Sequence, residues 1–210
     1  MPFNHNDHYH GQLLRQVPNG CRKALDVGCG TGEFARRLAA KGIDVDAIDA
    51  SEEALETARA RSAGHTVDYR HADVTTIDLP GGHYDYISCL ASIHHVPFET
   101  VAALREALSP DGVLAILGCY RESWPADLPV SLAAVPANAA ARLAVAAWEK
   151  GSAAAGAGRT RLHGPMDAPA MGPSMTLAEV RREAARLLPG CGVRRRLFWR
   201  YLLVYRNSPI

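Results

Sequence analysis

The sequence predicts an α/β domain in which helices cover both faces of a largely parallel β-sheet. Short apolar segments alternate with amphipathic ones from residue 23 to residue 120. This repeat of strand, helix and strand is typical of parallel strands, which need crossover connections. One segment, residues 84–90, is apolar over nearly its whole length, as is usual for a strand buried on both faces. The length of 210 residues suits a single domain spanning residues 1–210.

The repeat contains five strands and three helices. The strands are expected at residues 24–28, 43–50, 65–73, 84–90 and 112–120. The first helix covers residues 33–41, where apolar side chains recur at helical spacing. The second follows Ser51, which can cap it, and the third covers residues 98–108 and ends at the turn sequence SPDG.

The segments that flank this repeat differ in character. We interpret residues 1–18 as an N-terminal lid, with a frayed tail as the alternative. Residues 121–175 are rich in alanine, proline and glycine, and we expect a small helical cap to be inserted there. A helix capped by Thr176 follows. The last two strands, at residues 193–198 and 201–206, have too short a link for a crossover and must form an antiparallel hairpin.

Composition argues against several kinds of partner. The formal net charge of +1 gives no field that would attract nucleic acid or an anionic membrane. No apolar run reaches the roughly 20 residues of a transmembrane helix. The five cysteines are scattered without a CxxC pair, and the N-terminus is too polar for a signal peptide. We therefore expect a cytoplasmic protein with free thiols, as a monomer or a homodimer.

The segment ALDVGCGTGEF, residues 24–34, carries the most informative motif. Glycines at positions 28, 30 and 32 let the chain turn from a strand into a helix and pass close to a ligand. A dinucleotide loop has the spacing GxGxxG, but here the third glycine comes one residue early and Glu33 stands in the place of the expected glycine. Because Glu33 and Asp26 would repel a pyrophosphate, the loop suits a cationic or zwitterionic ligand end.

Two further carboxylates end neighbouring strands. Asp49 ends the second strand and can accept hydrogen bonds from both hydroxyls of a ribose. Asp73 ends the third strand and can accept from an exocyclic amine such as that of adenine. Together with the glycine loop, these positions predict a site for an amino-acid end, a ribose and an adenine along the carboxyl edge of the sheet.

These motifs resemble those of class I S-adenosylmethionine-dependent methyltransferases, in the small-molecule, methyltransferase type 11-like branch. LDVGCGTG matches the glycine motif, Asp49 the ribose acid, and Asp73 with Val74 the adenine contact. YDYISCLASIHHV matches the fourth-strand motif and LSPDGVLAIL the segment after the next helix. The resemblance covers residues 21–120 and the closing hairpin. It implies a Rossmann-like seven-stranded sheet of order 3-2-1-4-5-7-6 with strand 7 antiparallel, and S-adenosyl-L-methionine as the cofactor.

The resemblance also implies the remaining cofactor contacts. Asp26 and the backbone of Gly28 and Gly30 would hold the methionyl amine, while Tyr9 and His10 would contact the methionyl carboxylate or the substrate. Further positions along the cofactor are Cys29, Ala50, Val74, Cys89 and Leu90. We expect Cys29 to be a small filler, because a helix start lined with carboxylates does not favour a thiolate.

His94 and His95 follow the fourth strand, at the mouth where the methyl group is expected. Adjacent side chains point in different directions, and no carboxylate cluster lies nearby in the sequence, so we expect no metal. One histidine can act as a general base near neutral pH, while the other lines the cofactor or supports the next helix. We take His95 as the first catalytic candidate and His94 as the second.

The predicted function is in-line transfer of the methyl group of S-adenosylmethionine to a small, largely apolar metabolite. A secondary metabolite, a quinone-like ring or a lipid precursor would fit, and oxygen, nitrogen and carbon all stay open as the accepting atom. One alternative is an NAD(P)-dependent oxidoreductase, against which the early third glycine, Glu33 and the final hairpin argue. The other is a non-catalytic module that binds S-adenosylmethionine.

Overall fold

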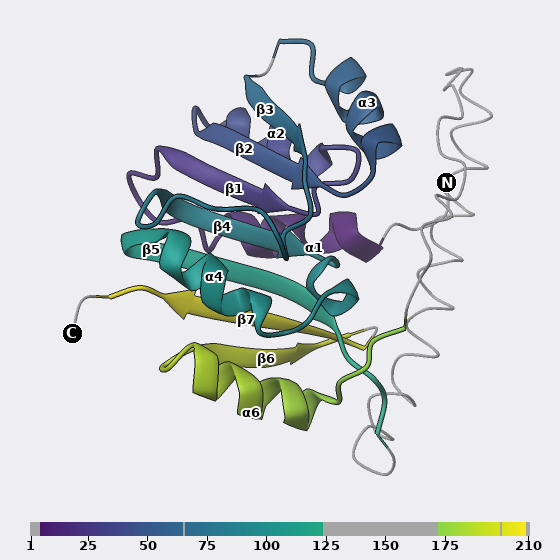
Figure 1. Ribbon diagram of the computed structural model, residues 1–210, viewed down its shortest axis with the longest axis vertical. Helices are drawn as coiled ribbons and strands as arrows, with labels where there is room; N and C mark the ends of the chain where they lie inside the picture. Colours follow the sequence, from purple (N-terminus) through teal and green to yellow (C-terminus); the bar gives the residue numbers. More distant parts are fainter. Residues whose placement is uncertain (1–4, 65, 124–171, 198, 209–210) are drawn as a thin grey trace, which may run out of the picture.

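A computed structural model describes residues 5–64, 66–123, 172–197 and 199–208. The cap predicted at residues 121–175 lies almost wholly outside these ranges. The structural description therefore concerns the sheet, its helices and the carboxyl edge on which the predicted site lies (Figure 1).

The strands form one seven-stranded sheet in the order β3-β2-β1-β4-β5-β7-β6 (Figure 1). They are β1 (Lys23–Val27), β2 (Asp44–Asp49), β3 (Val67–His71), β4 (Tyr84–Leu90), β5 (Leu108–Cys119), β6 (Gly192–Arg196) and β7 (Arg200–Arg206). Neighbours from β3 to β5 pair in parallel, whereas β7 is antiparallel to both β5 and β6. The predicted strand order and the closing antiparallel hairpin are both confirmed.

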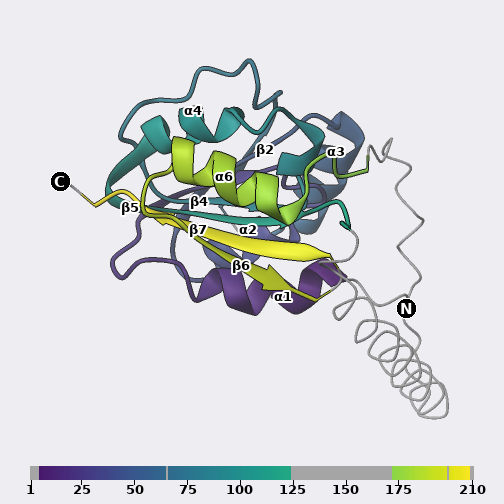
Figure 2. The same ribbon diagram turned by 90° about the horizontal axis from the view of Figure 1, so that it is seen from below.

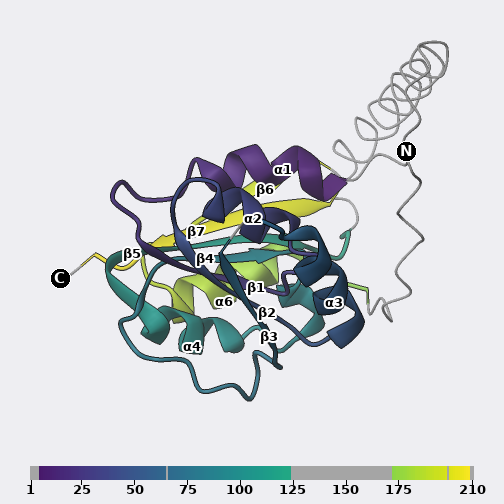
Figure 3. The ribbon, with the colours of Figure 1, turned by 90° about the horizontal axis from the view of Figure 1, so that it is seen from above.

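Helices cover both faces of this sheet. They are α1 (His5–Leu14), α2 (Glu33–Ala39), α3 (Glu52–Arg61), the short 3-10 helix η1 (Ile93–His95), α4 (Thr100–Ala107) and α6 (Leu177–Leu187). Figures 2 and 3 show α1 and α2 on one face, and α4 and α6 on the other. Buried side chains of α3 belong to the same core as those of α1 and α2.

Alternating side chains of the central strands supply the two cores. In β5, Leu114 and Ile116 pack in the layer of α4 and α6, whereas Val113 and Leu117 pack in the layer of α1 and α2. All four are 0% exposed. Burying one such side chain contributes roughly 1.5–3 kcal/mol. The strands that lead to the carboxyl edge are therefore held by buried side chains on both faces of the sheet.

Two helix starts carry the caps that the sequence predicts. The Ser51 side chain accepts a hydrogen bond from the backbone N–H of Ala54 at 3.2 Å. Thr176 forms a capping box with Glu179, in which each side chain accepts from the backbone of the other residue. Such caps satisfy N–H groups that have no partner inside the helix, and each is worth about 1 kcal/mol.

Several strand boundaries differ from the prediction, and in two of them the difference follows from pairing with a neighbouring strand. β5 begins at Leu108 rather than at residue 112, because Leu108 pairs with Tyr84 before a register shift in β4. β7 begins at Arg200 rather than at residue 201, because Arg200 pairs with Cys119 at the end of β5. Hydrophobic periodicity does not reveal either pairing, since both involve residues outside the apolar runs.

The N-terminal segment contains a packed helix, which argues against the frayed-tail alternative for α1. Leu13 is 0% exposed, and its carbonyl oxygen accepts from the Tyr86 hydroxyl at 3.0 Å. The Tyr9 hydroxyl donates to the carbonyl oxygen of Leu197 at 3.0 Å. These bonds attach α1 to β4 and to the turn between β6 and β7, next to the carboxyl edge.

Candidate active site

The glycine loop follows β1 and meets the end of β4. The backbone N–H groups of Gly28 and Cys29 both donate to the Ile48 carbonyl oxygen, at 2.8 and 3.1 Å. Gly28 has a φ of +68°, and a Cβ atom there would overlap the Ser92 side chain. Ser92 in turn donates from Oγ to the Val27 carbonyl oxygen at 2.8 Å. A glycine is needed at position 28 both for its conformation and for this close approach.

Asp49 fixes the shape of the same loop. One carboxylate oxygen accepts from the Gly30 N–H at 2.7 Å, and the other accepts from the Ser51 N–H at 2.9 Å. Asp49 is half-buried at the end of β2. Each carboxylate oxygen can accept more than one hydrogen bond, so these contacts leave capacity for ribose hydroxyls. The structure thus places the predicted ribose acid directly beside the glycine loop.

Asp26 lies below the loop and is enclosed. It is 1% exposed and accepts from the Ser88 hydroxyl at 2.7 Å. Burial raises the pKa of Asp26 to about 7, although the Ser88 hydrogen bond favours the ionised form. Near pH 7 the Asp26 carboxyl is therefore only partly ionised, and its predicted direct contact with the methionyl amine stays a prediction.

Glu33 does not contribute a free negative charge. Its carboxylate pairs with Arg36 at 2.9 Å and with Arg37 at 3.1 Å. The argument that Glu33 repels a pyrophosphate is therefore weaker than the sequence indicated, because two cations lie next to it. The acidic character of the loop depends instead on Asp49, which bonds to the loop, and on the partly ionised Asp26 below it.

Asp73 lies exposed after β3 and organises a turn. One of its oxygens accepts from both the backbone N–H and the hydroxyl of Thr75, at 2.8 and 2.7 Å, and these bonds lower its pKa. No described residue hydrogen-bonds its other oxygen. Val74 is half-buried and packs on the core beside it. This arrangement fits the predicted adenine contact, with one free carboxylate oxygen and an apolar neighbour.

The remaining predicted cofactor contacts lie at different depths. Ala50 is exposed, and its carbonyl oxygen is 3.0 Å from His71 Nε2. Leu90 is half-buried at the end of β4, and Cys29 is half-buried in the loop. Cys89 is 0% exposed and belongs to the core, so it lies beneath the edge rather than on it.

His10 joins α1 to the glycine loop helix. It is 3% exposed, and its ring centroid lies 5.3 Å from that of Phe34 at the start of α2. Tyr9 is 2% exposed. The structure therefore brings both predicted N-terminal residues to the carboxyl edge, and their contact with a ligand stays a prediction.

His94 and His95 lie in η1, directly after β4. Their ring centroids are only 4.0 Å apart, so the expected divergence of adjacent side chains is wrong for this tight helix. His94 is half-buried, and its Nδ1 has no hydrogen-bond partner among the described residues. Burial lowers the pKa of His94 to about 4, helped by the positive charges of His95 and Arg200. His95 is exposed.

The two histidines therefore differ in what they can do. His94 is neutral at pH 7 and too weak a base to hold a proton there, whereas His95 faces solvent at the mouth. Within the part of the chain that the structure describes, no three histidine, cysteine or carboxylate side chains are grouped to hold a metal ion. The arrangement fits a base or positioning group better than a ligand set.

A cavity of about 270 Å³, lined by apolar side chains together with Glu99 and Glu183, opens beside His94. It lies between η1, the start of α4 and α6, and its lining includes Phe98, Cys119, Met175 and Tyr201. Sequence reasoning missed Cys119 and Tyr201, because they come from β5 and β7 and meet η1 only in the folded sheet. The cavity is large enough for a small ring, and His94 of the predicted pair lines it.

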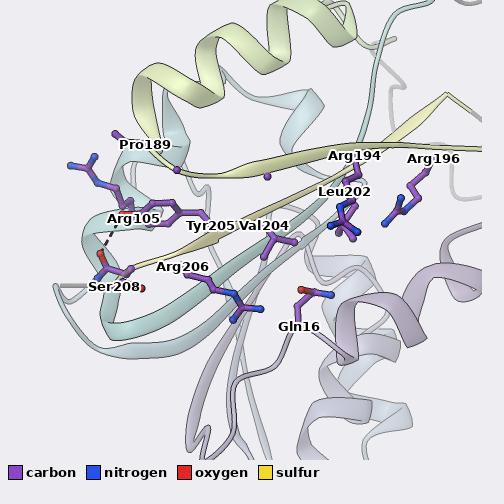
Figure 4. Close-up of a pocket in the computed structure, with 13 residues that line it drawn as sticks. Gln16, Arg105, Pro189, Arg194, Arg196, Leu202, Val204, Tyr205, Arg206 and Ser208 are labelled. Atoms are coloured by element: carbon purple, nitrogen blue, oxygen red, sulfur yellow. Dashed lines mark hydrogen bonds between the residues drawn. The ribbon is translucent and has the colours of Figure 1, made fainter. Parts of the chain in front are cut away.

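A larger hollow, of about 970 Å³, lies on the β6–β7 hairpin (Figure 4). Figure 4 shows Arg194, Arg196 and Arg206 around it, with Gln16 opposite. None of the predicted site residues lines it, and it contains neither the glycine loop nor the histidines. We therefore do not assign the chemistry to this surface.

Comparisons with known proteins agree with this geometry. A family model described as a methyltransferase domain matches residues 24–112. An uncharacterized methyltransferase of Mycobacterium tuberculosis is 32% identical over 208 residues, which cover 98% of each chain. A ubiquinone biosynthesis O-methyltransferase of Aromatoleum aromaticum is 38% identical over 96 residues, covering 43% of this chain and 41% of that protein.

Solved structures share the fold. An S-adenosylmethionine-dependent methyltransferase from Mesorhizobium loti superposes with a TM-score of 0.62 at 20% identity, over 96% of this chain and 99% of that one. A protein from Pyrococcus horikoshii superposes with a TM-score of 0.64 at 19% identity, over 95% and 88%. At such identities the similarity concerns the fold alone.

The fold, the residues at the carboxyl edge of the sheet and the similar proteins together define a Rossmann-like methyltransferase. The chain belongs to the class I S-adenosylmethionine-dependent methyltransferases of the small-molecule type. S-adenosylmethionine is accordingly its methyl donor, and the oxidoreductase alternative is set aside. Among the described helices, none is long and apolar enough to cross a membrane.

Proposed function

We propose that the protein transfers the methyl group of S-adenosylmethionine to a small, largely apolar metabolite. The observation that carries the proposal is the cavity of about 270 Å³, mostly lined by apolar residues, that His94 lines. His94 lies in η1, which directly follows Ser92, the residue that contacts Gly28 of the glycine loop. S-adenosylmethionine supplies a methyl group that its own sulfonium activates for in-line displacement, so the protein mainly has to align the reactants and exclude water.

The carboxyl edge supports a specific placement of the donor. Asp49 would accept hydrogen bonds from the ribose, and Asp73 with Val74 would hold the adenine. The backbone at Gly28 and Gly30 would hold the methionyl end, with the charge of Asp26 below it. The acidic edge fits a ligand that carries a sulfonium and an amine, because opposite charges at short range stabilise each other.

His95 is our candidate for the general base. It is exposed at the mouth, whereas the low pKa of its neighbour His94 makes His94 a poor proton acceptor at neutral pH. A base of this kind typically accelerates a reaction by about 10²–10⁴-fold when the accepting atom must lose a proton. A compound of secondary metabolism is the kind of acceptor we favour. The free cysteines fit a reducing cytoplasm.

Calorimetry and methyl transfer test this proposal together. S-adenosylhomocysteine should bind the wild-type protein while NAD does not, and labelled methyl should pass from S-adenosylmethionine to a member of a panel of small phenols, amines and enolisable acids. Binding without transfer to any compound would favour a non-catalytic module.

The base is tested with one variant and one control. We expect His95→Gln to lower kcat by about 10²-fold or more while the Kd for S-adenosylhomocysteine changes less than about twofold. His83→Gln is the matched control, because His83 is also exposed but precedes β4 at the opposite edge of the sheet. Equal losses of turnover and of binding, or an unchanged kcat, would contradict the role of His95 as a base.

A further inference from the structure

Arg200 lies at the carboxyl edge in an unusual environment. It is the first residue of β7 and pairs with Cys119, the last residue of β5. Its Nη1 donates to Cys119 Sγ at 3.3 Å, and sulfur is a weak acceptor. Its Nε is buried and has no hydrogen-bond partner among the residues that the structure describes. Among the described residues, no carboxylate forms an ion pair with it.

A buried guanidinium donor without an acceptor is costly and calls for a partner. Leaving such a group unsatisfied costs about 1–3 kcal/mol, and more for charged groups. In arginine, Nε and Nη2 present two parallel N–H groups along one edge of the planar guanidinium, which match the two oxygens of a carboxylate or phosphate. In Arg200 the bond to Cys119 uses Nη1, and no described residue accepts a hydrogen bond from Nε.

The surroundings of Arg200 belong to the predicted acceptor side. Arg200 is bonded to the last residue of β5, and β5 lies next to β4, the strand that leads into η1. Cys119, which accepts its hydrogen bond, also lines the cavity beside His94. Arg200 is therefore next to the wall of the cavity in which we place the methyl acceptor.

The nearby acids do not neutralise it. Glu99 and Glu183 line the same cavity, but both lie near Arg186, at 3.9 and 2.8 Å. The acids of the edge, Asp26 and Asp49, belong to β1 and β2, and β4 and β5 separate these strands from β7 in the sheet. Among the described residues, therefore, neither these acids nor those of the edge form an ion pair with Arg200.

We propose that Arg200 binds an oxyanion, a carboxylate or a phosphate, carried by the methyl acceptor. This inference rests on the proposed methyl transfer and narrows its acceptor to a small, largely apolar compound with one anionic group. The apolar part would occupy the cavity beside His94, and the anionic group would reach Nε and Nη2. Arg200 is then a specificity residue, because it binds the acceptor through a group that is remote from the reacting atom.

Matched small probes test the inference on the full-length protein saturated with S-adenosylhomocysteine. The probes are 4-hydroxybenzoate, its neutral counterpart 4-hydroxybenzamide, and phenyl phosphate, each titrated by NMR. We expect the wild type to bind at least one anionic probe about tenfold or more tightly than the amide. The stronger of the two anions identifies the group as carboxylate or phosphate.

Three variants assign the preference to Arg200. Arg200→Gln should raise the Kd for the preferred anion by about 10- to 100-fold and leave the Kd for the amide unchanged. Arg200→Lys keeps the charge without the fork and should retain part of the preference. Arg194→Gln is the control, because Arg194 is exposed on the same hairpin and should change nothing. Melting temperatures confirm that each variant folds.

The outcomes separate this inference from the proposed function. If S-adenosylhomocysteine binds but neither anion is preferred over the amide, or if Arg200→Gln and Arg194→Gln behave alike, the role of Arg200 is refuted and the methyltransferase proposal stands. If S-adenosylhomocysteine itself fails to bind the wild type, both fall together.

Discussion

Gly28→Ala adds one methyl group where the glycine loop meets the end of β4, and its cost can be worked out from the structure. The φ of +68° at Gly28 costs an alanine about 1–2 kcal/mol. The added Cβ also overlaps the Ser92 side chain, and overpacking of this kind typically costs about 1–3 kcal/mol. We expect a loss of about 2–5 kcal/mol in the free energy of unfolding, or roughly 4–20 °C in Tm.

Chemical denaturation of four variants separates the two contributions. Gly20→Ala has a similar φ of +76° and no atom within 4 Å of its Cβ, so it should show the conformational cost alone. Ser92→Gly removes the overlapping side chain and its bond to Val27, which costs about 1 kcal/mol by itself. The double variant with Gly28→Ala should recover about 1–3 kcal/mol relative to the sum of the single variants. A Gly28→Ala cost no larger than that of Gly20→Ala, or additive single variants, would refute the reasoning.

Two buried carboxylates should show opposite dependences of stability on pH. Burial raises the pKa of Asp26 to about 7, above its unfolded value, so its contribution falls as the pH rises from about 4 to 7, by up to about 4 kcal/mol. Asp26→Asn should flatten this slope in denaturation at pH 5 and pH 8, and an unchanged slope would contradict the burial argument. The stability contribution of Asp46 has the opposite dependence on pH. Burial alone would raise the pKa of Asp46, but hydrogen bonds from Lys23 and Tyr84, with the charges of Lys23 and Arg70, outweigh burial and lower this pKa. Its contribution is present above about pH 4 and is lost as the pH falls further, so Asp46→Asn should cost about 1–3 kcal/mol at pH 7 and little at pH 3. An equal cost at both pH values would rule out an ionic role for Asp46.

Much of the fold follows from local sequence features. The apolar run of β4 and the alternating character of the final hairpin predict strands because side-chain direction in a strand has a period of two residues. Ser51 and Thr176 mark helix starts because their side chains replace missing backbone acceptors. Each of these signals involves residues only a few positions apart, which is why sequence alone reveals them.

The candidate site depends on contacts between residues that are far apart in the sequence, and the spacing of residues does not reveal such contacts. The bond from Gly30 to Asp49 and the enclosure of Asp26 by Ser88 join residues from different strands. The sequence does not show that Arg200 pairs with Cys119 at the carboxyl edge, because the two residues belong to strands that are far apart in the chain. Charge and residue type indicated which groups could act, but only tertiary pairing decides which of them meet.

The positions of the charged residues along the carboxyl edge indicate how the protein would accelerate methyl transfer. Groups that hold a substrate equally well before and during the reaction lower KM without raising kcat. We place Asp49 on the ribose and Arg200 on an anionic group remote from the reacting atom. Both residues should therefore lower KM without raising kcat. Acceleration must then come largely from aligning the methyl group with the acceptor, which can supply about 7–11 kcal/mol. The bond from Ser92 to Val27 and the left-handed Ala91, with φ of +53°, hold η1 against the glycine loop, and this junction is where that alignment would be set.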